Sequence, residues 1–203
     1  MKSMIKDALI LFAITVIAGL LLGGVYQITK EPIAVQEALA ASDACKEVFP
    51  DASAFEQDPA FASDGPTSVY NIQYPDESVD DVLKALDPDG KTLGYVLTVT
   101  TREGYGGDIR FMMGIRNDGT LNGISILSIS ETAGLGMQAE DVLVPQFAGK
   151  KADQFKYTKD GAMSDSEIDA ISGATITTNA VTNGVNAGLS YFYSALSPVE
   201  GGE

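Results

Sequence analysis

The chain has 203 residues, with 28 acidic and 13 basic side chains, and its formal net charge at pH 7 is −15. A charge of that sign repels the phosphate backbone, so nucleic acid is excluded as a partner. The chain has no histidine and a single cysteine, Cys45. This excludes a Ser-His-Asp triad, His-based metal or haem sites, an intrachain disulfide, and a cysteine-ligated cluster held by this chain alone. An electron-carrying function would therefore require an organic cofactor.

Residues 8–29 carry no charge and are mostly apolar, which is long enough to span a bilayer as a helix. Lys2 and Lys6 precede them and a strongly acidic body follows. The positive-inside rule then places the N-terminus in the cytoplasm and the rest of the chain outside it. A cleaved signal peptide is the alternative, but the apolar run is longer than usual and lacks an A-x-A site. We expect residues 1–30 to form a cytoplasmic tip and a single-pass anchor in the cell (inner) membrane, in contact with lipid.

Residues 31–66 are predicted to form a membrane-proximal helix and a loop. Pro32 is typical of a helix start, and an apolar face follows it up to Pro50. We expect Cys45 on that face to be a small buried apolar residue. The Asp, Ser, Pro and Gly content of residues 51–66 indicates a loop. The apolar face consists of Val35, Ala38, Leu39, Cys45 and Phe49.

Residues 67–197 are predicted to form one α+β domain with an antiparallel sheet and packed helices, followed by a tail at 198–203. Turn signals at 87–91 and 117–120 separate short β-branched segments, a pattern typical of a meander. A short helix is expected at 141–147 and a last helix at about 177–196, both packed on the sheet. The predicted strands are 92–101, 108–116 and 121–130, with a weak candidate at 69–74 and a strand or single helical turn at 81–86.

Two glycine-rich loops, 104–107 and 131–136, fall at strand ends where a ligand could reach them. Neither has the spacing of a Rossmann or Walker phosphate loop. A ligand site and a plain tight turn are both compatible with glycine loops of this kind. The acidic stretches 76–90 and 160–169 lack the EF-hand order. We therefore interpret them as solvated turns and expect no metal site.

The stretch from Asp169 to Thr178 is the most informative part of the chain. It places four hydroxyls and a glycine within seven residues, directly before an apolar helical face that begins at Val181. Ser172 or Thr175 is predicted to cap that helix. Free N–H groups and the helix dipole make such a terminus favourable for an anion, typically a phosphate. An ordinary Ser/Thr-rich cap is the alternative interpretation.

The order Asp169, two residues, then Ser172-Gly173-Ala174-Thr175 resembles the flavinylation motif of the FMN-binding subunits of Rnf and Na⁺-translocating NADH:quinone reductase complexes. In those families a flavin transferase esterifies the last threonine of the motif with the phosphate of FMN. The resemblance implies a covalent FMN on Thr175 and recognition of Asp169 by the transferase. It implies no catalytic residue. The remaining cofactor-binding positions that it implies in this stretch are Ser172, Gly173, Ala174 and Thr178.

The loop Glu131-Thr-Ala-Gly-Leu-Gly136 resembles the Glu-Thr-Pro-Gly-Leu-Gly segment of the same families, with Ala133 in place of the proline. There the loop borders the flavin ring, and its backbone N–H groups can tune the potential of the flavin. The flavin-lining residues that this second resemblance implies are Glu131, Thr132, Gly134, Leu135 and Gly136.

Length and layout are most similar to the G component of the Rnf electron transport complex, which couples ferredoxin oxidation and NAD⁺ reduction to ion pumping. The resemblance implies an electron-carrying subunit that is not catalytic alone and whose partners are other membrane subunits. The C component of the Na⁺-translocating NADH:quinone reductase, usually with a longer domain, is an alternative. A stand-alone extracytoplasmic flavoprotein and an acidic module that only binds partners are two others.

Overall fold

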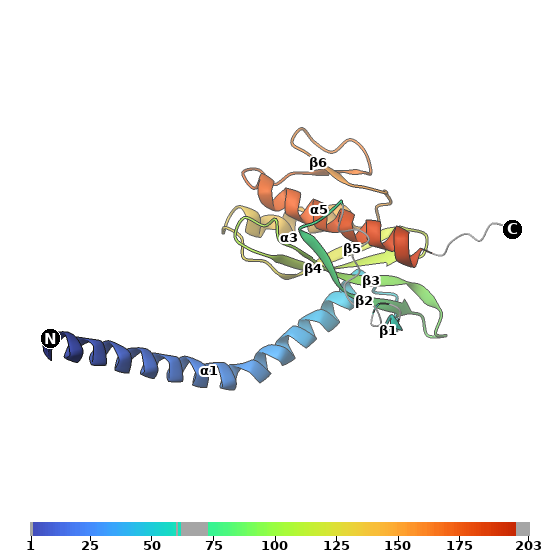
Figure 1. Ribbon diagram of the computed structural model, residues 1–203. Helices are drawn as coiled ribbons and strands as arrows, with labels where there is room; N and C mark the ends of the chain where they lie inside the picture. The colour runs from blue at the N-terminus through green and yellow to red at the C-terminus, as the bar shows by residue number, and fades with distance from the viewer. Residues whose placement is uncertain (1, 60, 62–72, 198–203) are drawn as a thin grey trace. The chain divides into compact units, whose positions relative to one another are not determined.

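The computed structural model of the chain describes residues 2–59, 61 and 73–197 (Figure 1). The chain divides into two compact units, residues 1–40 and 41–203. The first unit belongs to helix α1 (Lys2–Val48), whose residues 4–40 are all exposed. Exposed apolar side chains along a helix of this length favour a lipid environment. The helix is long and apolar enough to cross a membrane, which fits the predicted anchor.

The predicted helix start at Pro32 is wrong, because Pro32 lies inside the continuous helix α1. A proline costs an internal helix one backbone hydrogen bond, and α1 continues on both sides of it. The predicted apolar face is also only partly correct. Val35 and Leu39 are more than half exposed, and burial begins at Ala44. Cys45 is buried at 4% exposure, as predicted, and its thiol donates to the Met112 sulfur at 3.7 Å.

The second unit is built on a five-stranded antiparallel sheet in which each strand pairs with the next along the chain. This confirms the predicted meander and the α+β class. Gly90 and Gly119, at φ +79° and +83°, supply the left-handed residues of two of its turns. The strands are β1 (Ala54–Gln57), β2 (Glu77–Leu86), β3 (Thr92–Thr101), β4 (Ile109–Arg116) and β5 (Leu121–Ser128).

Two of these strands differ from the secondary structure predicted from the sequence. Strand β1 occupies part of the segment 51–66, for which the expectation of a loop throughout is wrong. Strand β2 begins at Glu77, so the segment 81–86 is strand and not a helical turn. Most of the candidate strand at 69–74 lies outside the described residues, as does the tail at 198–203. Residues 41–57, assigned from sequence to a membrane-proximal segment, belong to the second unit.

Side chains on the two faces of the sheet form two separate cores. Along β4, Phe111 and Met113 point to one face, and Met112 points to the other, where Cys45 packs. The first face is covered by helix α5 (Thr175–Tyr191), which continues as a π-turn, η2 (Phe192–Leu196) (Figure 1). The predicted apolar face of this helix is confirmed. Val181, Val185, Leu189 and Phe192 are fully buried, and Leu196 packs against the same core.

Helix α5 packs directly against the sheet at two of its glycines. A Cβ at Gly184 would lie 2.9 Å from the Phe111 ring, and one at Gly188 would overlap the Met113 sulfur. On another side of α5, Asn186 accepts from the Phe155 N–H at 2.7 Å and donates to the Phe155 carbonyl at 2.9 Å. The second half of the helix is therefore held between the sheet and the chain next to β6.

The remaining elements are short. In place of the single helix predicted at 141–147 there are η1 (Gly136–Gln138), α3 (Ala139–Val142) and α4 (Val144–Phe147). Strands β6 (Lys156–Thr158) and β7 (Glu167–Asp169) pair in parallel and were not predicted. The interpretation of the two acidic stretches as solvated turns is therefore wrong for residues 167–169, and it is also wrong for residues 77–86, which form β2. Three-residue strands carry too little periodicity to be recognised from sequence.

Candidate functional site

Helix α5 begins at Thr175 with Ala174 at the N-cap, and no side chain caps it. The prediction that Ser172 or Thr175 is the cap is therefore wrong. Ser172 is exposed, and Thr175 already lies in the first turn. Within the described residues, the backbone N–H groups of Thr175, Ile176 and Thr177 have no hydrogen-bond acceptor. Three adjacent free donors at the positive end of a helix are a favourable place for a phosphate.

The turn before the helix is held from inside by Thr178, which is fully buried. Its hydroxyl accepts from the Ile171 N–H at 3.1 Å and donates to the Ala174 carbonyl at 2.9 Å. Gly173 sits at φ +79°, a conformation that disfavours other residues. Thr178 thus shapes the turn and does not line the pocket. The left-handed backbone at position 173 explains why a glycine stands there.

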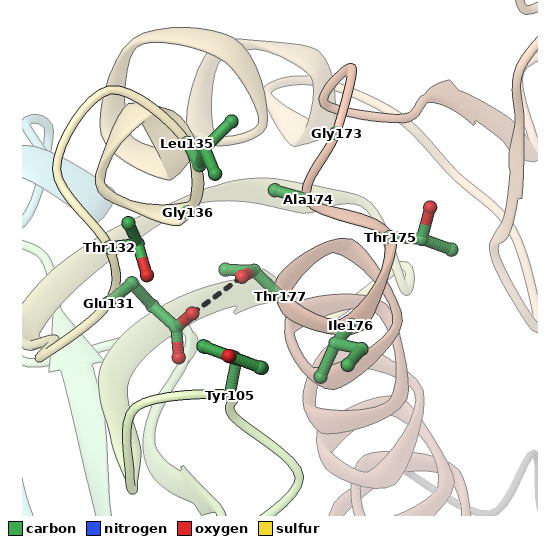
Figure 2. Close-up of a pocket in the computed structure, with 10 residues that line it drawn as sticks. All are labelled: Tyr105, Glu131, Thr132, Leu135, Gly136, Gly173, Ala174, Thr175, Ile176 and Thr177. Carbon is green, nitrogen blue, oxygen red and sulfur yellow. Dashed lines mark hydrogen bonds between the residues drawn. The ribbon is translucent and has the colours of Figure 1, made fainter.

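The turn forms one wall of a pocket of about 510 Å³, a size usual for small-molecule sites. The opposite wall comes from the loop that follows β5, so the structure brings together the two stretches singled out separately in the sequence (Figure 2). The lining residues are Tyr105, Glu131, Thr132, Leu135, Gly136, Gly173, Ala174, Thr175, Ile176 and Thr177.

Glu131 connects three segments at the base of this pocket. Its side chain is buried at 9% exposure, and its two carboxylate oxygens have separate partners. Oε2 accepts from the Thr177 hydroxyl at 2.7 Å, and Oε1 accepts from the Gly106 N–H at 3.0 Å. These charge-assisted bonds tie the β5 loop to α5 and to the loop between β3 and β4. The pocket is therefore formed before any ligand enters it.

Some predicted site residues lie away from the pocket lining. Gly134 and Ser172 are exposed and do not line it. Asp169 lies at the end of β7, where its carboxylate accepts from the Ala162 N–H at 2.6 Å. Its exposed position suits recognition by another protein, and it has no contact with the pocket.

Three lining residues were missed in the sequence: Tyr105, Ile176 and Thr177. Ile176 and Thr177 directly follow the motif and come to the pocket with the first turn of α5. Tyr105 lies in the glycine loop 104–107, for which a ligand site and a plain turn were both left open. Its neighbouring glycines are the only signal in the sequence that could have indicated it.

The electrostatics of the pocket are unusual for a phosphate-binding site. Its lining residues include one carboxylate and no lysine or arginine. A phosphate here would be stabilised by backbone N–H groups and the helix dipole alone. The apolar side chains of Leu135, Ala174 and Ile176 offer a surface for a ring system. Donors for a phosphate and apolar contacts for a ring both fit FMN. Among the residues that the structure describes, no cluster of metal-ligating side chains is present.

Another buried carboxyl lies outside the pocket, at the start of β2. Glu77, at 2% exposure, accepts from the Thr101 hydroxyl at 3.3 Å. Burial, and then the negative charges of Glu103 and Asp76, raise the pKa of Glu77 to about 7. Glu103 in turn accepts from the amides of Asn179 and Asn183 on α5, at 3.1 and 2.6 Å. This cluster supports the first half of the helix.

Comparisons with known proteins identify the family of the chain. Residues 104–190 match the FMN-binding domain family, and residues 1–48 match the RnfG N-terminal region. The G component of the Na⁺-translocating ferredoxin:NAD⁺ oxidoreductase complex of Acetobacterium woodii is 33% identical, over 94% of this chain and 92% of its own. The proton-translocating counterpart of Clostridium ljungdahlii is 32% identical, over 89% of this chain and 90% of its own. Among solved structures, NqrC of Shewanella oneidensis is 23% identical with a TM-score of 0.48, and covers 58% of each chain.

The fold, the pocket and the family match together define an FMN-binding domain that follows a helix suited to membrane anchoring. More narrowly, the chain belongs to the RnfG family, the G components of the ion-translocating ferredoxin:NAD⁺ oxidoreductase complexes. The resemblance noted in the sequence is thereby confirmed. Membership makes the chain an electron-carrying subunit of a redox translocase, with FMN as its cofactor.

Proposed function

We propose that the chain relays electrons within an Rnf-type complex through an FMN joined by a phosphoester to Thr175. In this proposal residues 67–197 are the FMN-binding domain, outside the cytoplasm, and residues 1–30 anchor it in the cell membrane with the N-terminus inside. The match of residues 1–48 to the RnfG N-terminal region supports an RnfG function over that of the C component of the NADH:quinone reductase. The partners are then the other membrane subunits, lipid, and a flavin transferase.

The position of the Thr175 side chain carries the proposal. Its hydroxyl makes no hydrogen bond within the part of the chain that the structure describes, and the residue is only half-buried. Figure 2 shows this side chain on the outer side of the turn, pointing away from Glu131 and Thr177. A transferase can therefore reach the hydroxyl on the folded domain. The three free N–H groups of the helix start would hold a phosphate attached there.

The lack of cations in the pocket lining supports a covalent link. Free FMN carries a doubly charged phosphate, and backbone N–H groups with a helix dipole stabilise such a charge only modestly. The chain as a whole carries a net charge of −15, which adds repulsion. Reversible binding would therefore be weak. A phosphoester removes one phosphate charge and makes retention of the cofactor independent of its affinity.

The proposed residue roles follow from this placement. FMN, when bound, supplies a group that accepts and releases electrons reversibly. The helix N–H groups would hold its phosphate, Gly173 and Ala174 would leave room beside it, and Thr178 keeps the turn in shape. Thr132, Leu135 and Gly136 would border the ring, and Glu131 holds the walls of the pocket together. Asp169 remains available for recognition by the transferase.

The test is the fluorescence of the denatured protein on a gel after co-expression with a flavin transferase. The wild-type band should fluoresce under ultraviolet light, and the Thr175→Ala band should be dark. Thr177→Ser keeps a hydroxyl two residues away and serves as the control, which should fluoresce like the wild type. A fluorescent Thr175→Ala band would place the flavin elsewhere and would contradict the proposal.

A further inference from the structure

Apolar side chains exposed to solvent gather around the pocket. Six large hydrophobic residues are exposed in the described part of the second unit; three of them, Met137, Met163 and Tyr193, lie outside the pocket lining. The other three are Tyr105 at 70%, Ile176 at 51% and Leu135 at 41%. All three line the pocket. Exposed apolar surface that is concentrated at one place marks a binding site more often than scattered residues do. Tyr105 is the most exposed of the three and the only aromatic residue in the lining.

We propose that Tyr105 is the aromatic surface against which the isoalloxazine ring of the Thr175-linked FMN packs. This inference rests on the proposed function, because it takes the flavin at Thr175 as its starting point. It adds a flavin-contacting residue that lies outside both sequence motifs.

The backbone of the loop that carries Tyr105 is closely packed. A Cβ at Gly104 would overlap the Gly107 carbonyl, and one at Gly106 would overlap the Ser130 carbonyl. Gly106 also donates its N–H to Glu131 at 3.0 Å. The backbone on both sides of Tyr105 is therefore closely packed and anchored to a buried carboxylate. A fixed backbone lowers the entropy cost of an aromatic contact with a ligand.

The Tyr105 side chain itself is free to accept a partner. No ring contact and no hydrogen bond of its hydroxyl occurs within residues 2–59, 61 and 73–197. A rigid backbone that presents an unpartnered aromatic ring at a pocket is difficult to explain by stability, since the ring gains no burial there. Contact with a bound ring system explains it, because offset or edge-to-face packing of two aromatic systems is favourable.

The attachment point is compatible with this placement. In Figure 2 Tyr105 lies beside Ile176 at one side of the pocket, with Leu135 across from them and Thr175 at the rim. The ribityl chain of FMN is flexible and can turn from the outer side of Thr175 over Ile176. The ring would then lie between Tyr105 and Leu135, with water excluded from the face that Tyr105 covers.

The test compares the flavin fluorescence of the folded and the unfolded full-length protein after co-expression with a flavin transferase. A tyrosine packed on an isoalloxazine ring quenches its fluorescence, so unfolding the wild type should increase the emission several-fold. Tyr105→Leu should abolish most of that increase, because its folded form is already bright. Tyr105→Leu should also weaken the visible circular dichroism of the bound flavin, and Tyr105→Phe, which keeps an aromatic ring, should retain it.

Tyr193→Leu is the matched control. Tyr193 is also exposed, at 38%, but it follows the far end of α5, roughly 27 Å from Thr175 at the rise of an α-helix. Its fluorescence ratio should equal that of the wild type. Equal quenching in Tyr105→Leu and the wild type, or an unquenched wild type, would overturn the inference while the flavin adduct on Thr175 stays intact. Loss of the adduct from the wild type would instead overturn the proposed function, and mass spectrometry separates the two results.

Discussion

The Thr177 hydroxyl donates a 2.7 Å hydrogen bond to Glu131, and this buried contact joins residues 46 positions apart in the chain. Thr177 belongs to the first turn of α5, and Glu131 follows strand β5. The bond holds the turn that carries Thr175 against the loop that borders the pocket. A pre-formed pocket of this kind reduces the ordering cost of binding a ring.

Replacing Thr177 with valine tests this bond. The change leaves Glu131 buried with only the Gly106 N–H as a partner, and a buried carboxylate that loses a donor is destabilised. We expect the Thr177→Val protein to lose about 1–3 kcal/mol of stability. Thermal unfolding in detergent should show this as a lower Tm. Thr177→Ser keeps the hydroxyl and should unfold close to the wild type. A Tm for Thr177→Val equal to that of Thr177→Ser would show that the bond contributes nothing.

Gly136 provides a second test of the same contact. A Cβ at this position would lie 2.5 Å from the Thr177 hydroxyl oxygen and 2.7 Å from the Glu131 carboxylate. Gly136→Ala should therefore force the two walls apart and cost about 1–3 kcal/mol by overpacking. Gly123→Ala in strand β5 is the control, since a Cβ there meets nothing within 4 Å. The measurement is the Tm of both variants, which should be lower for Gly136→Ala. Equal Tm values for the two proteins would contradict the close contact at Gly136.

Variants of Thr178 and Ser172 distinguish a residue that holds the turn from an exposed residue of the motif. Thr178→Val removes the two hydrogen bonds that hold the turn, and we expect a loss of about 1–3 kcal/mol together with slower flavin attachment. Ser172→Ala should leave the Tm unchanged, because this exposed side chain does not cap the helix. The measurement is the rate of flavin incorporation by purified transferase, next to the Tm. A large drop in Tm for Ser172→Ala would contradict the observed helix start.

Glu77 should make stability depend on pH. Its pKa is raised from 4.5 to about 7 in the folded protein, mainly by burial. Between these two values the folded state binds more protons than the unfolded state, so this carboxyl reduces stability as the pH rises from 4.5 to 7. Glu77→Gln removes the effect and should raise the stability at pH 8 by about 1–3 kcal/mol. The Tm of both proteins from about pH 5 to 8 tests this, and parallel curves would refute it.

Much of the fold could be predicted from the sequence because its signals are local. β-branched runs separated by glycine turns indicated β3, β4 and β5, and the spacing of Val181, Val185 and Leu189 indicated α5. Strand β1 could not be recognised, since its four residues are held mainly by pairing with β2. Pro32 was misleading because a helix long enough to cross a membrane tolerates one missing backbone hydrogen bond.

Site residues that belong to a sequence motif could be predicted. Residues that only the packing of the fold brings to the pocket could not. Thr175, Glu131 and Leu135 came from motif resemblance, and the structure places them around one pocket. The contribution of Tyr105 depends on a loop more than twenty residues before Glu131, and only the folded sheet brings the two together. That Thr178, and not Ser172, holds the turn is likewise a matter of burial, which hydroxyl spacing does not reveal.

The mass of the intact chain tests the phosphoester on Thr175 most directly. The full-length protein, purified after expression with a flavin transferase, should be heavier than its amino acids by one FMN less one water. Expression without the transferase, or of Thr175→Ala with it, should give the unmodified mass. A wild-type chain of unmodified mass under conditions in which a known substrate of the transferase is modified would contradict the account.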